Sequence, residues 1–283
     1  QHLLKSKELG EFNGLPKNPY RWRVAMAQIR ETQEDMDDAL DLLGEAEKLY
    51  MGDFSPNVRP ISALKARVWV KQGELEKALD WARERKLSIE EEPSYLREFE
   101  QITFVRILLS QYQSDHSINL LHDTMGLLQR LLKAAEEGGR TGSVIEILIL
   151  EALARQIQED IPAALLSLKR ALKLAEPEGY MRIFLAEGSS MAKLIHDMDA
   201  RGILPNYTRK LLSAFEVADQ GLDVETPPSA ESASSSLIEA LSQRELDLLR
   251  LFKTELSGPE IAQELVIALS TVRTHTKSIY NKL

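Results

Sequence analysis

The chain has 283 residues, of which 43% are hydrophobic and 28% charged, as expected for an ordinary globular protein of roughly two domains. It has no cysteine, which excludes disulfides and thiol catalysis, and no run of about 18 apolar residues, so we expect no transmembrane helix. The formal net charge of −9 excludes a uniformly basic surface. We expect a cytoplasmic protein without membrane contact.

The first residues, QHLLKSKELG, contain neither an initiator methionine nor the basic-then-apolar pattern of a signal peptide. This start predicts that the sequence is a fragment of a longer protein.

Residues 1–219 are predicted to be almost entirely helical, because apolar residues recur at three- and four-residue spacing and alternating β-branched residues are scarce. Proline and glycine breaks divide the region into helix pairs. The pairs are expected over 20–50, 60–87, 94–137 and 141–175, with hinges near Gln33–Asp35, Gln72-Gly73, Ser114–Ser117 and Glu159–Pro162. Units of roughly 35–45 residues are typical of helical-hairpin repeats.

The second helices share a small residue followed by a large one, as in Ala39-Leu40, Ala78-Leu79 and Ala164-Leu165. A small residue lets two helices approach closely, and its large neighbour fills the space between units. The segment GELEKAL at Gly73–Leu79 is similar to the tetratricopeptide motif. We therefore predict an all-α, tetratricopeptide-like superhelix with a concave surface, the alternative being a generic helical bundle.

Four segments resemble the sensor region of the large, ATP-dependent LuxR-type activators of the MalT-like group. They are DDALDLLGEAEKLY, RPISALKARVWVKQGELEKALDWARE, SYLREFEQITFVRILL and ALKLAEPEGYMRIFLAEG. The resemblance implies a sensor superhelix and, upstream of Gln1, a nucleotide-binding domain.

Aromatic and arginine residues on the predicted first helices could form a groove for an effector, either a small molecule or a protein. The candidates are Arg21, Trp22, Arg67, Trp69, Tyr95 and Arg97, with Gln28, Glu98 and Arg106 beside them. The alternative is that the tryptophans belong to the core and the arginines are solvated or salt-bridged.

Residues 220–236 are predicted to be a flexible linker. Pro227-Pro228 forbids helix continuation, and the Ser/Ala-rich run that follows has no apolar stripe. Such a tether would let the two domains move relative to each other.

Residues 237–283 predict three short amphipathic helices. Ser257 and Glu260 have the spacing of a capping box ahead of the middle helix, and Pro259 suits the first helical turn. A short helix, a turn and a helix with basic and hydroxyl side chains indicate a helix-turn-helix. The domain carries six Lys/Arg and six Asp/Glu, so the chain's entire net charge of −9 comes from the residues before it. After Glu264 the only charged residues are basic.

The stretches LSQREL, SGPEIAQEL and STVRTHTKSIYNKL closely resemble the LuxR-type helix-turn-helix. Three departures stand out: Glu255 replaces a usual glycine, Ala268 replaces the usual capping serine, and the chain stops at Leu283, where the family continues into a fourth helix. Because that helix commonly serves in dimerisation, the resemblance leaves dimerisation through this domain open. Ser270 or Thr271 would have to supply the missing cap.

The N-terminal residues of the second helix of such a motif meet base edges in the major groove. Thr271, Arg273, Thr274 and Lys277 lie on adjacent turns, and the resemblance implies groove contacts for the last three. Phosphate contacts are expected from Ser257, Thr271 and Lys282. Ser270, at the start of the helix, is also expected to contact DNA. The alternative is an ordinary solvated helix face.

Signatures of an enzyme, a cofactor site or a metal site are missing from the sequence. The glycine-rich stretch Gly138–Ser143 lacks the lysine of a phosphate loop and is interpreted as an inter-repeat loop. The five histidines show no metal-ligand spacing.

The sequence thus predicts a transcriptional regulator that binds double-stranded promoter DNA under the control of an effector, and the family resemblance favours an activator. Self-association and contact with RNA polymerase are further expectations. The alternative is a helical-repeat interaction scaffold with no direct DNA binding.

Overall fold

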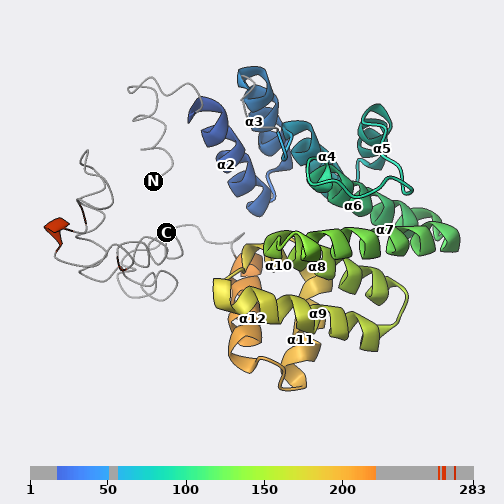
Figure 1. Ribbon diagram of the computed structural model, residues 1–283, viewed down its shortest axis with the longest axis vertical. Helices are drawn as coiled ribbons and strands as arrows, with labels where there is room; N and C mark the ends of the chain where they lie inside the picture. The colour runs from blue at the N-terminus through green and yellow to red at the C-terminus, as the bar shows by residue number, and fades with distance from the viewer. Residues whose placement is uncertain (1–17, 51–56, 221–260, 262, 266–270, 272–283) are drawn as a thin grey trace. The chain divides into compact units, whose positions relative to one another are not determined.

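The computed structural model describes residues 18–50, 57–220, 261, 263–265 and 271. Every regular element within these residues is a helix (Figure 1), which confirms the all-α prediction for the described part of the chain. The chain divides into two compact units, residues 1–220 and 221–283. Each unit is described by itself.

The first unit is a succession of helical hairpins that follow the predicted order. The four predicted pairs are α2 (Asn18–Thr32) with α3 (Met36–Leu49), α4 (Ile61–Gln72) with α5 (Leu75–Glu84), α6 (Glu98–Asp115) with α7 (Ile118–Glu137), and α8 (Thr141–Ile157) with α9 (Ile161–Ala175). Then follow the 3-10 turn η1 (Glu176–Glu178) and the short α10 (Arg182–Leu185). A fifth pair, α11 (Gly188–Ala200) with α12 (Pro205–Gln220), ends the unit.

Each predicted hairpin turns at one residue with a positive φ. The four residues are Glu34 (60°), Gly73 (77°), His116 (53°) and Glu159 (61°). Only Gly73 adopts this left-handed conformation without strain from a Cβ atom. The second helix then begins, and its N-terminus is capped in two cases by an aspartate side chain.

Five residues after three of these turns lies an alanine with no exposed surface: Ala39, Ala78 and Ala164. This position lies on the first buried turn of the second helix, where the absence of a larger side chain allows close helix approach. The α6–α7 hairpin differs, since the buried Leu121 occupies the corresponding position.

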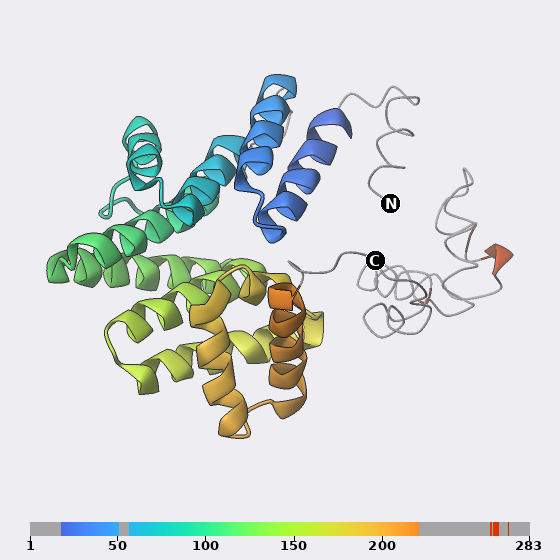
Figure 2. The same cartoon turned by 180° about the vertical axis from the view of Figure 1, so that it is seen from behind.

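The hairpins stack so that first helices contact one another: α4 packs on α6, and α6 on α8. Second helices α3, α5 and α7 each pack on the first helix that follows. One hydrophobic cluster runs from α4 to α12, and a smaller one joins α2, α3 and α4. Figure 2 shows the same succession from behind. This is the nearest-neighbour stacking of a tetratricopeptide-like solenoid.

Candidate DNA-binding and effector-binding sites

Most of the predicted DNA-contact residues lie outside the described residues. These are Ser257, Ser270, Arg273, Thr274, Lys277 and Lys282. In the second unit, Ile261 is helical and 2% exposed, and its carbonyl oxygen accepts from the Leu265 N–H at 3.0 Å. Gln263 and Glu264 are exposed, as on the outer face of an amphipathic helix. Thr271 is helical and half-buried.

The six predicted effector residues fall into three separate places in the first unit. Arg21 and Trp22 lie on α2, Arg67 and Trp69 on α4, and Tyr95 and Arg97 in the segment that enters α6. Arg21 is exposed and Trp22 half-buried, with the Arg23 guanidinium 5.9 Å from the Trp22 ring centroid. The structure does not collect the six side chains into one groove.

Arg67 belongs to a buried network of charges that joins helices α4, α6 and α8 with the residue that precedes α11. Its Nη1 donates to Glu146 on α8 at 2.7 Å, and its Nε donates to Thr103 on α6 at 2.8 Å. Arg106 on α6 donates to the same Glu146 oxygen at 2.9 Å. Two further Arg106 bonds, at 2.8 and 3.0 Å, reach Glu187 just before α11.

These four side chains form a neutral set of two arginines and two glutamates, and each is less than one-fifth exposed. Burial alone would raise the pKa of the Glu146 carboxyl, but the paired Arg67 and Arg106 lower that pKa to about 2. Burial lowers the pKa of Arg67 to about 10. The network links successive hairpins through buried ion pairs that water screens weakly.

One aromatic ring packs against the arginines of this network. The Arg67 guanidinium lies 3.8 Å from the centroid of the Phe99 ring, and that of Arg59 lies 5.3 Å from it. Stacking on Phe99 and bonds to Thr103 and Glu146 engage the ring face, Nε and Nη1 of Arg67, whereas its buried Nη2 has no hydrogen-bond partner among the described residues. The contacts of Arg67 match the alternative stated from the sequence, in which the arginines form salt bridges.

Arg97 is likewise engaged in a network at the start of α6. It bonds Glu91 at 2.5 Å and Glu100 at 3.3 Å, and Arg85 bonds the same Glu100 carboxylate at 2.6 Å. Tyr95 remains 58% exposed, with the Arg140 guanidinium 5.7 Å from its ring centroid. Trp69 is half-buried against the core, with Lys65 Nζ 5.8 Å from its ring centroid.

Sequence reasoning missed Glu146 and Glu187 as partners of the arginines. A usable signal was present for Glu146, because it is the single charge within the apolar run VIEILIL of α8. A buried charge is almost always paired, so that isolated carboxylate predicts a buried cation opposite. Nothing comparable marks Glu187, which lies between the short helix α10 and α11.

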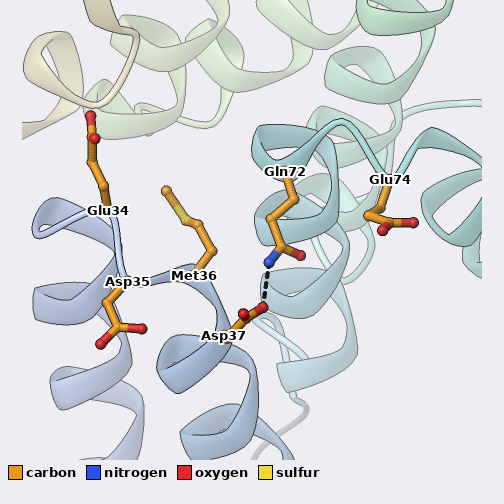
Figure 3. A pocket seen from close by; sticks show the side chains of 6 residues that line it. All are labelled: Glu34, Asp35, Met36, Asp37, Gln72 and Glu74. Atoms are coloured by element: carbon orange, nitrogen blue, oxygen red, sulfur yellow. Dashed lines mark hydrogen bonds between the residues drawn. The ribbon is translucent and has the colours of Figure 1, made fainter.

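A shallow depression of about 350 Å³ lies where two hairpin turns meet (Figure 3). It is lined by Glu34, Asp35, Met36, Asp37, Gln72 and Glu74. The Gln72 side chain donates to Asp37 at 2.9 Å and ties the α4 end to the start of α3. The depression contains none of the six predicted effector residues.

Two further properties of the described residues bear on function. They contain no group of three or more His, Cys, Asp or Glu side chains that could hold a metal ion. No described helix is both long and apolar enough to cross a membrane.

Comparison with known proteins identifies both units. Residues 1–201 match the MalT-like TPR region, and residues 239–283 match the luxR family of bacterial regulatory proteins. No solved structure matches the chain.

The chain is 23% identical to HTH-type transcriptional regulator MalT of Serratia proteamaculans (strain 568), over 96% of this chain and 31% of that protein. It is 27% identical to MalT of Vibrio cholerae serotype O1, over 65% of this chain and 21% of that protein. The chain thus spans less than a third of the length of these relatives. With the tetratricopeptide-like hairpins followed by a luxR-family region, the chain belongs to the MalT-like family of LuxR-type regulators.

Proposed function

We propose that this chain is the sensing and DNA-binding part of a transcriptional activator that acts on double-stranded promoter DNA. The observation that carries the proposal is the order of its two units, a MalT-like superhelix followed by a luxR-family region. Base-edge contacts are assigned to Arg273, Thr274 and Lys277 of the recognition helix. Phosphate contacts are assigned to residues at the helix starts and at the C-terminus: Ser257, Ser270, Thr271 and Lys282.

The distribution of charge supports this assignment. The residues from Ser236 onward are neutral, although the chain as a whole carries −9, and no acid follows Glu264. Within this C-terminal region the residues after Glu264 are therefore net positive, and they include the recognition helix. An acidic superhelix repels DNA and leaves this single region to make contact.

The superhelix is proposed to bind a small-molecule or protein effector that controls promoter binding. Stacked hairpins offer an extended surface for such a ligand. Arg21 and Tyr95 are exposed, and Trp22 and Trp69 are half-buried, so these members of the predicted set have accessible surface for a ligand. Self-association and contact with RNA polymerase belong to the same proposal, as does an NTPase domain upstream of Gln1.

Selection from a pool of random duplex DNA tests the DNA-binding part. This chain, and a version extended past Leu283, would be equilibrated with the pool at low and moderate salt. Enrichment of a short motif by either chain supports a sequence-specific regulator. If neither enriches a motif nor binds DNA at low salt, the interaction scaffold becomes the better account.

The Lys277→Ala variant sharpens this experiment, and Lys253→Ala serves as its matched control. Lys277 belongs to the predicted recognition helix, whereas Lys253 precedes the predicted middle helix in the sequence. Loss of one phosphate or base contact is expected to weaken DNA binding. If the lost contact is to a phosphate, the slope of the logarithm of the binding constant against the logarithm of the salt concentration should also fall by about one unit. Equal binding by Lys277→Ala would mean that the recognition helix is wrongly assigned.

A further inference from the structure

Two arginines share one aromatic ring where the second hairpin of the superhelix begins. Arg59 lies immediately before α4, and its guanidinium carbon is 5.3 Å from the centroid of the Phe99 ring on α6. Arg67 lies on α4, and its guanidinium carbon is 3.8 Å from the same centroid. The two cations are therefore no further apart than the sum of these distances, which is close enough for them to repel each other.

Arg67 has a buried hydrogen-bond donor that the protein does not use. Its Nε donates to Thr103 on α6 and its Nη1 to Glu146 on α8, but its Nη2 is buried and has no acceptor among the described residues. Buried polar groups in folded proteins nearly always have a partner, so an orphaned donor indicates a water, an ion or a ligand that completes the site. A guanidinium donor forms its strongest hydrogen bonds with an anion.

The pKa values of the two buried arginines identify the same group. Burial and the neighbouring Arg106 lower the pKa of Arg67 to about 10, and Glu146 offsets this only in part. Burial also acts to lower the pKa of Arg106, but the carboxylates of Glu187 and Glu146 outweigh it and raise that pKa above its ordinary value. Arg67 is thus the arginine of the network whose charge the protein compensates less.

Arg59 adds a positive charge beside this network. The residue is exposed and makes no ion pair with any residue that the structure describes. Counted together, Arg59, Arg67 and Arg106 oppose only two carboxylates, those of Glu146 and Glu187, which leaves one positive charge in excess. A singly charged anion would neutralise this set.

The glutamates on either side of Phe99 are already committed to other partners. Glu98 bonds Arg140 at 2.7 Å, and Glu100 bonds Arg85 at 2.6 Å. Both carboxylates are less than one-tenth exposed, so each is held in place by its own arginine. They are therefore not available to the two arginines on the ring.

We propose that Arg59 and Arg67 form a binding site for a small oxyanion, a molecule that carries a carboxylate or a phosphate group. One of its oxygens accepts from Arg67 Nη2 and another from the Arg59 guanidinium. Because Arg59 is exposed, its long side chain can move aside to admit the ligand and then close on it. Arginine suits this task, since its planar fork matches the oxygens of both groups. The site rests on these contacts alone, whereas its role as the effector site of the superhelix rests on the proposed function.

The position of Arg67 gives such a ligand a route to the whole superhelix. Arg67 on α4 bonds Thr103 on α6 and Glu146 on α8, so it contacts three successive hairpins. An oxyanion that satisfies Nη2 removes the orphaned donor from this junction. Because the ligand binds the folded chain and not the unfolded one, it stabilises the packing of these hairpins.

The test is isothermal titration calorimetry of the whole chain at constant ionic strength. The probes are acetate and inorganic phosphate, with acetamide as the neutral comparator of acetate. We expect one saturable site for at least one oxyanion and none for acetamide, and the tighter of the two oxyanions identifies the ligand group as a carboxylate or a phosphate. If neither oxyanion binds saturably, the proposal is overturned.

Substitutions of Arg59 locate the site. Arg59→Gln is expected to weaken oxyanion binding by on the order of tenfold or more, whereas Arg59→Lys keeps the charge without the fork and should lose less. Arg201→Gln is the matched control, because Arg201 is exposed at the end of α11 and should not affect the binding constant. Circular dichroism checks that each variant is folded. Equal losses in Arg59→Gln and Arg201→Gln would assign binding to the overall charge of the protein and overturn the site.

Glu146→Gln gives an independent outcome. Removing this carboxylate makes the set of charges more positive, so the oxyanion should bind more tightly than to wild type. It should accordingly raise the melting temperature of the variant by more than it raises that of wild type. A smaller rise in the variant would mean that the oxyanion does not lie on Arg67, which also overturns the proposal.

The effector role is tested separately from the site. DNA affinity, measured with and without the oxyanion at constant ionic strength, should change in wild type and not in Arg59→Gln. An unchanged DNA affinity in wild type overturns the effector role while the site stands. Selection of DNA in the absence of the oxyanion tests the proposed function itself, so the two failures are distinguishable.

Discussion

Replacing Glu146 by Gln should be among the most destabilising single changes of charge in this protein. The substitution keeps the shape of the side chain but leaves Arg67 and Arg106 without the carboxylate that both bond at 2.7 and 2.9 Å. Removing one partner of a buried ion pair typically costs about 3–5 kcal/mol, because the remaining charge is then buried and unpaired. We expect a loss of about 3 kcal/mol, since Glu187 still compensates Arg106.

The pKa of Glu146 leads to the same magnitude. It lies at about 2, compared with an ordinary value of 4.5. At 1.36 kcal/mol for each unit, this difference corresponds to about 3 kcal/mol of stabilisation by the ionised carboxylate. Both lines of reasoning assign the effect to the charge of Glu146, which Glu146→Gln removes at nearly constant volume.

Urea denaturation followed by circular dichroism measures the effect as a change in the free energy of unfolding. Asp80→Asn is the matched control, because the Asp80–Arg83 pair is 66% and 63% exposed and should contribute at most about 1 kcal/mol. A double-mutant cycle with Arg67→Met isolates the pairwise part. If Glu146→Gln lost less than about 1 kcal/mol, the claim that this network joins the hairpins would be refuted.

Three further predictions concern pH and the hairpin turns. Because its folded-state pKa is depressed, Glu146 stabilises the fold above about pH 4.5 and loses this contribution as the pH falls toward 2. The free energy of unfolding of Glu146→Gln should therefore fall less than that of wild type as the pH is lowered over this range. Gly73→Ala should cost about 1 kcal/mol in urea denaturation, since φ is +77° although the site is open; an unchanged midpoint would contradict the left-handed turn. Ala164→Leu should lower the free energy of unfolding by about 1–3 kcal/mol, because it overpacks a fully buried site. Ala200 is exposed, so Ala200→Leu should be nearly neutral. Equal effects of the two substitutions would mean that the hairpin helices are not closely packed at Ala164.

The hairpins were predictable from sequence because their signals are local. The turns at Glu34, Gly73 and Glu159 each precede a small-then-large pair by a fixed interval, so hinge and helix face could be placed together. The α6–α7 turn at His116 lies within the predicted hinge Ser114–Ser117, although a leucine and not an alanine follows it at the fifth position. The α11–α12 hairpin was recognised only as helical, although Gly202, with a positive φ, and Pro205 mark its turn.

The charged network could not be predicted in the same way. It joins residues separated by 79 and 81 positions, and periodicity within one helix does not report which carboxylate faces which arginine. The sequence left open whether Arg67 and Arg106 face a ligand or form salt bridges. In the structure these side chains bond Glu146 and Glu187.

The DNA contacts remain a prediction from the motif, as the residues that carry it lie outside the described ones. The buried Ile261 and exposed Gln263 and Glu264 agree with the expected face of the middle helix. The predicted effector residues likewise remain a prediction, and Trp22 and Trp69 provide a fluorescence readout for screening candidate ligands.

The most direct measurement of the central claim is fluorescence anisotropy of a selected duplex and a scrambled duplex of equal length, with wild type and Arg273→Ala. Wild type should bind the selected duplex more tightly, and Arg273→Ala should lose about 1–3 kcal/mol on that duplex while its affinity for the scrambled one stays nearly the same. Equal affinity of wild type for both duplexes, or an unaltered preference in Arg273→Ala, would contradict sequence-specific recognition by this helix.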